Sequence, residues 1–86
     1  MIPWHVYILT NATNTRLYTG ISTDVGRRLK QHNGWEPGGA YSTRPGRPWE
    51  LLYTEGPFPT RGDALRREAA IKKMSRETKL ALVDTG

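Results

Sequence analysis

The sequence contains no cysteine, which excludes disulfide bonds and metal sites built from thiolates. It also lacks an apolar run long enough to cross a lipid bilayer, and it shows no secretory signal peptide. We therefore expect no membrane contact and a cytoplasmic location. Repeats, linkers and low-complexity segments are absent as well. We expect the 86 residues to form one domain, with a core at about 4–74 and a last helix at about 75–83.

Acidic residues are in short supply: eight Asp and Glu stand against 13 Lys and Arg, which leaves a formal net charge of +5. Lys and Arg that neutralise phosphates release condensed counterions, so a basic surface favours binding to nucleic acid. The charge alone is not specific, because it also serves solubility. With 36% hydrophobic residues and three Trp, the chain has enough apolar side chains to fold around a core.

Hydrophobic periodicity, caps and turn-forming residues predict three strands and three helices. The strands are placed at residues 1–9, 17–22 and 49–55. The helices are placed at residues 25–33, 60–74 and 75–83. Gly56, Pro57 and Pro59 are expected to end the third strand, and the stretch 35–48 is expected to be a loop with one helical turn near Tyr41. The pattern indicates an α+β fold, in which helices pack against a three-stranded antiparallel sheet.

The first two predicted strands each carry a tyrosine, within Val6-Tyr7-Ile8-Leu9 and Leu17-Tyr18-Thr19-Gly20-Ile21. Because side chains alternate along a strand, Tyr7 lies on the face opposite to Val6 and Ile8. Tyr18 shares a face with Gly20. Facing or diagonal residues of a hairpin lie within about 8 Å, so both phenols can address one bound group. Taken alone, such a pair is more often plain sheet structure.

The two tyrosine segments and four later ones together resemble the GIY-YIG nuclease domain. The later segments are Arg28-Leu29-Lys30-Gln31-His32-Asn33, Gly39-Ala40-Tyr41, Pro48-Trp49-Glu50-Leu51 and Ala64-Leu65-Arg66-Arg67-Glu68. Their order and spacing, over about residues 4–74, are similar to those of small single-domain bacterial members and of the nuclease half of endonucleases that cut branched DNA. Val6-Tyr7-Ile8 replaces Gly-Ile-Tyr and Tyr18-Thr19-Gly20 replaces Tyr-Ile-Gly, so both tyrosines and the glycine are kept.

Glu68 interrupts an apolar arc on its predicted helix. Ala64 and Ile71 lie on one side of it and Leu65 lies on the other. A buried carboxylate costs roughly several kcal/mol unless a cation compensates it. Lys72 is one candidate, but such an i,i+4 pair contributes only about 0.2–0.5 kcal/mol, which suffices if the arc is half covered. The resemblance implies Mg²⁺ or Mn²⁺ instead, since one carboxylate with waters and substrate oxygens can hold Mg²⁺.

The resemblance implies a divalent-metal-dependent endonuclease that hydrolyses DNA, in repair or recombination. In such an enzyme Glu68 holds the metal on the leaving-group side and Arg28 contacts the phosphate, while Tyr7, Tyr18 and His32 orient or deprotonate the attacking water. Which of these residues is the general base stays open. A free phenol has a pKa of about 10, so it needs nearby positive charge to act as the base, whereas imidazole, with a pKa of about 6.5, does not. From the residues alone, Arg28 and His32 on one helical face fit a shared anion, but equally a solvated basic face with a buried histidine.

Further basic and aromatic side chains are expected to form a groove that follows the DNA backbone. They are Lys30, Tyr41, Arg44, Arg47, Arg66 and Lys72. A solvated helix face explains Arg67 and Lys73 at least as well, and Trp49 is equally suited to the core. Two alternative functions remain: a non-catalytic basic module that binds nucleic acid, and a nuclease subunit that a protein partner activates and directs to its substrate. Branched or nicked DNA is the substrate that the resemblance suggests.

Overall fold

The computed structural model describes residues 2–11, 13 and 15–85, and of Tyr41, Ser42 and Thr85 it describes the backbone alone. The strands are β1 (Trp4–Asn11), β2 (Leu17–Ser22) and β3 (Trp49–Phe58). The helices are α1 (Val25–His32), the 3₁₀ helix η1 (Tyr41–Gly46), α2 (Arg61–Lys72) and α3 (Arg76–Thr85). Both the α+β class and the three-stranded antiparallel sheet are confirmed. None of the helices in the described ranges is long and apolar enough to cross a membrane.

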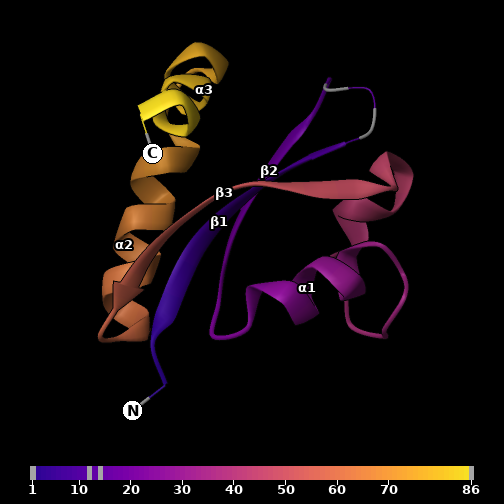
Figure 1. Cartoon of the computed structure of the whole chain (residues 1–86), viewed down its shortest axis with the longest axis horizontal. Coiled ribbons are helices and arrows are strands. Elements are labelled where there is room, and N and C mark those ends of the chain that lie inside the picture. The colour runs from indigo at the N-terminus through magenta and orange to yellow at the C-terminus, as the bar shows by residue number, and fades with distance from the viewer. Residues whose placement is uncertain (1, 12, 14, 86) are drawn as a thin grey trace.

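β1 is the central strand of the sheet, and it pairs in antiparallel fashion with β2 on one side and β3 on the other. Its side chains alternate between two cores, as predicted. Val6 and Ile8 pack against α2, whereas Tyr7 and Leu9 face α1, and all four are at most 1% exposed. Figure 1 shows the resulting layers, with α2 and α3 on one side of the sheet and α1 on the other.

The three α-helices begin where polar side chains cap them. Asp24, Thr60 and Ser75 each accept a hydrogen bond from the backbone N–H three residues further on, at 3.0, 3.1 and 3.2 Å. Such caps satisfy donors that the first turn of a helix leaves without partners. These local contacts explain why the predicted starts of all three helices lie close to the observed ones.

β3 continues to Phe58, so the prediction that Gly56 and Pro57 end this strand is wrong. The register shows why: Trp4 pairs with Phe58 and Val6 with Glu55, which leaves Gly56 and Pro57 together opposite a single residue of β1. This is a β-bulge, and β3 lies at the edge of the sheet, where a proline need not donate to a further strand. The bulge absorbs the two residues that appeared from the sequence to break the strand.

Arg67 joins α2 to the sheet. The interpretation that places Arg67 on a solvated helix face is therefore wrong. Its guanidinium donates two hydrogen bonds to the carboxylate of Glu55 on β3, at 2.6 and 3.0 Å. The two side chains are only 32% and 27% exposed. Since Glu68 follows Arg67 directly on α2, this paired contact also fixes the helix turn that carries Glu68.

Candidate active site

Tyr7 lies directly opposite Gly20 in the pairing of β1 with β2. Tyr18 pairs with Leu9, so the two tyrosines are diagonal neighbours on one face, with ring centroids 6.3 Å apart. The glycine has a clear role here, because a Cβ at position 20 would lie 2.5 Å from the phenol oxygen of Tyr7. The Tyr7 ring therefore lies across the space that the missing side chain leaves open, and the predicted placement of the two tyrosines on one face of the hairpin is confirmed.

His32 ends α1 and binds the hydroxyl group of Tyr7. Tyr7 Oη lies 2.8 Å from His32 Nε2, and His32 Nδ1 lies 3.1 Å from Thr43 Oγ1. The Thr43 hydroxyl donates its single proton to the carbonyl oxygen of Ala40, at 2.6 Å. Thr43 must therefore accept from Nδ1–H, which leaves Nε2 of the neutral imidazole without a proton. It follows that His32 Nε2 accepts the hydrogen bond and Tyr7 Oη–H donates it.

The surroundings keep this histidine neutral. Burial, together with the charges of Arg28 and Arg47, lowers the pKa of His32 to about 4, and its side chain is 0% exposed. The buried histidine that the sequence allowed as one alternative is thus what the structure shows, and the ordinary imidazole pKa of about 6.5 does not apply to it. Burial also raises the pKa of Tyr7 to about 12; the nearby guanidinium of Arg28 opposes this rise, and Tyr18 and Glu68 add to it. At neutral pH the pair is an uncharged phenol donating to an uncharged imidazole.

Lowering the pH should destabilise the fold through His32. Its pKa is about 4 in the folded chain against 6.5 in the unfolded one, so the unfolded chain binds more protons between these values and stability is lost as the pH falls through them. We expect the free energy of unfolding to drop by about 2 kcal/mol between about pH 7.5 and about pH 5. Denaturant unfolding measures this drop, and His32→Gln should remove it. An equal drop in the variant would contradict the assignment to His32.

Arg28 is held beside the same phenol. Its Nη1 donates to Oε1 of Gln31 and to the carbonyl oxygen of Gly38, both at 2.7 Å. Arg28 lowers the pKa of Tyr7 against the effect of burial, so the guanidinium lies within electrostatic range of the Tyr7 hydroxyl. Because Arg28 and His32 are one helical turn apart, α1 presents a fixed cation and a neutral proton acceptor to one phenol.

Glu68 comes from α2, and its side chain is only 16% exposed. Its charge contributes to the raised pKa of Tyr7, so the carboxylate lies within electrostatic range of the phenol. Oε2 lies 3.5 Å from Nζ of Lys72, whose side chain is 54% exposed. The predicted helical pair with Lys72 therefore forms. A pair with an exposed lysine contributes only about 0.2–0.5 kcal/mol, which cannot offset most of the free-energy cost of burying the Glu68 carboxylate.

The donor set around Glu68 suits one kind of metal ion. Among the side chains that the structure describes, no three His, Cys, Asp or Glu groups gather in a metal-binding cluster. An ion held by Glu68 would complete its shell with water and phosphate oxygens. Mg²⁺ retains several waters and uses one or two carboxylates with substrate oxygens, so the single carboxylate fits it.

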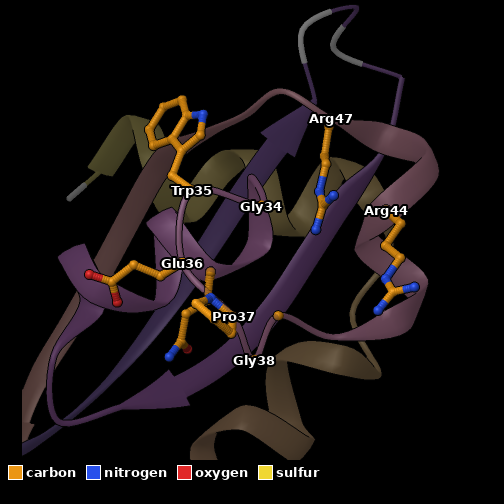
Figure 2. A pocket seen from close by; sticks show the side chains of 9 residues that line it. Gly34, Trp35, Glu36, Pro37, Gly38, Arg44 and Arg47 are labelled. Carbon is orange, nitrogen blue, oxygen red and sulfur yellow. The ribbon is translucent and has the colours of Figure 1, made fainter.

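Two of the residues expected to bind nucleic acid lie together. Arg44 and Arg47 line a cavity of about 370 Å³ beside α1, which Figure 2 shows from close by. Lys30 is exposed on α1, whose N-terminal half carries Arg28. The side chain of Tyr41 lies outside the described part of the chain, so its predicted role stays a prediction.

The other two, Arg66 and Lys72, lie on α2, across the sheet from α1. Each is exposed and pairs with an acidic residue of its own helix, Arg66 with Asp63 and Lys72 with Glu68. The structure therefore brings Tyr7, Tyr18, Arg28 and His32 together, with Glu68 in electrostatic range. It does not gather all the predicted DNA-binding residues on one face.

Thr43 is the residue that sequence reasoning misses. It is 0% exposed, and its carbonyl oxygen accepts a 2.6 Å hydrogen bond from the indole N–H of Trp49. Trp49 itself is 3% exposed and belongs to the core, as one interpretation of the sequence held. Nothing in the local pattern around Thr43 points to His32, because the contact depends on how η1 folds back on α1. The glycines and prolines of the loop were the available signal that this segment takes a special course.

Comparisons with known proteins show which family the chain resembles. The sequence model of the GIY-YIG catalytic domain matches residues 3–81. A UPF0213 protein of Haloquadratum walsbyi is 41% identical over 86 residues, which cover 100% of this chain and 93% of the relative. One of Streptococcus agalactiae is 42% identical over 82 residues, with 95% and 89% covered. The UPF0213 protein YhbQ of Escherichia coli is 40% identical over 86 residues, with 100% and 82% covered.

A solved structure is similar as well. The solution NMR structure of a UPF0213 protein from Bacillus halodurans has a TM-score of 0.57 and 39% sequence identity, and the match covers 95% of this chain and 83% of that one. The family model thus spans the whole sheet, α1, α2 and the first part of α3, and the relatives are small proteins matched over most of their length. With both tyrosines and the glycine in the places that the fold requires, the chain belongs to the GIY-YIG family.

Proposed function

We propose that this protein is a divalent-metal-dependent endonuclease that hydrolyses phosphodiester bonds in DNA. Members of the GIY-YIG family are endonucleases, so membership implies nuclease activity on DNA. The observation that carries the proposal is the 2.8 Å hydrogen bond from Tyr7 to an imidazole that must accept it. A module that only binds DNA needs positive charge. It has no use for a buried proton acceptor aimed at a phenol, with an arginine and a largely buried carboxylate in range.

The arrangement supports a proton relay. Phosphodiester hydrolysis needs a proton acceptor for the attacking water and stabilisation of charge on the phosphoryl oxygens. In our proposal Tyr7 Oη accepts the proton of the water while its own proton moves to Nε2 of His32. Thr43 accepts from Nδ1–H throughout and holds the ring in the required tautomer. Tyr18 covers the imidazole, with ring centroids 4.7 Å apart.

The low pKa of His32 is consistent with this role once substrate is bound. Arg28 is the second cause of the low value after burial. In the proposal Arg28 binds the scissile phosphate, whose negative charge offsets that of the guanidinium and makes an imidazolium easier to form. Glu68 would hold Mg²⁺ or Mn²⁺, which, when bound, supplies Lewis-acid stabilisation of charge on the phosphate and the leaving oxygen. Repair or recombination is the proposed setting, by analogy with endonucleases that act on branched DNA.

Purified protein should nick or cut DNA when Mg²⁺ or Mn²⁺ is present, and a chelator should stop the reaction. Plasmid, single-stranded and branched DNA are the substrates to compare. Binding without cleavage of any of them would favour the idle binding module or a missing partner.

DNA binding, measured with chelator present, should weaken steeply as the salt concentration rises. On a duplex, a plot of the logarithm of the binding constant against the logarithm of the salt concentration should have a slope of about −0.9 for each phosphate neutralised, and base preference should be weak. A binding constant that does not change with salt would contradict the prediction of a basic DNA-binding surface.

Gly20→Ala should lower kcat by about tenfold or more, because the added methyl group would lie 2.5 Å from the phenol oxygen and 2.7 Å from Cζ of Tyr7 and would push the ring away. Overpacking should also destabilise the fold by about 1–3 kcal/mol. The matched control is Gly26→Ala on α1, where the new Cβ meets only an oxygen of Asp24, at 3.7 Å. The control should keep full activity and gain up to about 1 kcal/mol of stability. Equal activity in both variants would contradict the packing argument.

A further inference from the structure

The cavity that Arg44 and Arg47 line lies beside the active site, between η1 and the loop that follows α1. It has a volume of about 370 Å³, and its lining includes Gly34, Trp35, Gly38, Arg44 and Arg47. Figure 2 shows the two arginines on one side of the cavity and the loop on the other. Small-molecule sites have volumes of about 300–1,000 Å³, so this one is of a size for a single nucleotide. A paired duplex cannot enter it.

The cavity offers both kinds of contact that a nucleotide needs. Arg44 and Arg47 supply two positive charges for a phosphate, and Arg guanidinium groups suit phosphate geometry. Trp35 stands on the rim and projects outward from the loop, with 69% of its surface exposed. An exposed indole has an apolar face on which any base can stack. Most large apolar side chains of this protein are at least half buried, so the exposure of Trp35 calls for an explanation.

Glycines fix the shape of the cavity wall. Gly34 and Gly38 have φ values of 79° and 108°, which side chains rarely adopt. A Cβ at Gly34 would lie 2.7 Å from Nη1 of Arg47, so this guanidinium packs directly against the glycine backbone. A Cβ at Gly39 would collide with the carbonyl oxygen of Gln31 on α1. The loop therefore lies tightly against α1, and a site formed before binding loses less freedom on binding.

Two hydrogen bonds connect the cavity with the active site. Arg28 Nη1 donates to the carbonyl oxygen of Gly38 in the cavity wall, at 2.7 Å. Arg47 Nε donates to the carbonyl oxygen of His32, at 2.6 Å. A strand whose phosphate lies on Arg28 would thus carry its neighbouring nucleotide to the mouth of the cavity.

We infer that this cavity binds one unpaired nucleotide of the DNA strand, next to the phosphodiester that is cut. Its phosphate lies on Arg44 and Arg47 and its base stacks on Trp35. The inference rests on the proposed function, because it takes DNA as the ligand. A paired base would bring its complement and the second strand, for which the cavity has no room. The protein should therefore favour DNA in which a nucleotide next to the cut is unpaired.

The test measures binding with chelator present, so that no DNA is cut. A labelled oligothymidylate strand and a blunt oligothymidylate–oligoadenylate duplex of equal length are titrated with the full chain. Trp35→Ala should weaken binding of the single strand by about tenfold and leave duplex binding within twofold of the wild type, since only the unpaired base loses a stacking partner. Trp35→Phe should restore most of the loss. Ile2→Ala removes another exposed apolar side chain, 70% exposed, and should change neither affinity.

The outcomes separate the cavity from the nuclease. An unchanged single-strand affinity in Trp35→Ala, or equal losses for both DNAs, overturns the inference, as does a wild type that does not bind the single strand. Cleavage with Mg²⁺ is assayed in parallel. A wild type that cuts no DNA but shows the Trp35 effect would favour the idle binding module or a missing partner over the proposed endonuclease, and would keep the cavity. If the wild type cuts DNA but Trp35→Ala binds the single strand as tightly as the wild type does, only the inference that the cavity binds a nucleotide is refuted.

Discussion

Glu68→Gln should reduce Mg²⁺-dependent DNA cleavage by about a thousandfold or more. Metal-ion stabilisation of transition-state charge is worth roughly several kcal/mol, and each 1.36 kcal/mol corresponds to a factor of ten in rate. DNA affinity measured with chelator should stay near that of the wild type, because Glu68 is 16% exposed and contributes no positive charge. Single-turnover cleavage gives the rate, and titration with labelled DNA gives the affinity.

Glu77→Gln is the matched control, since it makes the same change of charge in the first turn of α3. It should cut DNA as fast as the wild type. Titration with Mn²⁺ in the absence of DNA gives a second readout, in which Glu68→Gln should lose binding that the control keeps. If Glu68→Gln cut DNA at the wild-type rate, the metal assignment would be removed, and the pair with Lys72 would be the better account of this carboxylate.

Glu68 could be found from the sequence because it breaks a pattern. A carboxylate in the middle of an apolar helical arc is a conflict between local sequence and burial, and such conflicts concentrate at functional sites. The sequence could not rank the two explanations. The structure adds the quantities that matter. Nζ of the exposed Lys72 lies 3.5 Å from Oε2 of Glu68, and the charge of Glu68 contributes to the raised pKa of Tyr7.

The fold was predictable where local rules decide it. The bounds of β2 and the start of α1 follow from alternation and from Asp24, whose carboxylate caps the helix. β1 was predicted at 1–9 and lies at Trp4–Asn11, because its end depends on contacts across the hairpin. There the side-chain oxygen of Asn11 accepts from the backbone N–H groups of Thr15 and Arg16, both at 2.9 Å. The bulge that extends β3 likewise depends on its place at the sheet edge, which no single segment reveals.

The chemistry of His32 was less predictable than its position. Helical spacing placed it beside Arg28, but its protonation state depends on Thr43 and on Arg47, which reach it from the segment after the loop. The tautomer follows from a chain of hydrogen bonds that ends at a backbone carbonyl. Such a chain becomes visible only when the segments are assembled. The sequence and its family resemblance therefore pointed to Tyr7, Tyr18 and His32 but left open which of the three is the base.

Tyr7→Phe should lower kcat by about a hundredfold or more, which is within the range for loss of general base catalysis. Phe keeps the ring in the core beside Leu9 and Trp49 but removes the hydroxyl. It also leaves Nε2 of the buried His32 without its donor, which should cost about 1–3 kcal/mol of stability. Tyr18→Phe is the matched control, because this phenol packs on His32 as well but is only partly buried, and it should cost less in both respects.

The pH dependence of kcat/KM then distinguishes the two proton acceptors. If the proton of water passes through neutral Tyr7 to His32, the imidazole is already unprotonated well above its pKa of about 4, and the wild type should show a flat profile between about pH 6 and about pH 8. A phenolate base would give a rise that continues above about pH 8, because the pKa of Tyr7 is about 12. A rising limb near about pH 6.5 that disappears in His32→Ala would show a histidine with an ordinary pKa. Full activity in both Tyr→Phe variants would contradict the relay and leave the two tyrosines as sheet structure.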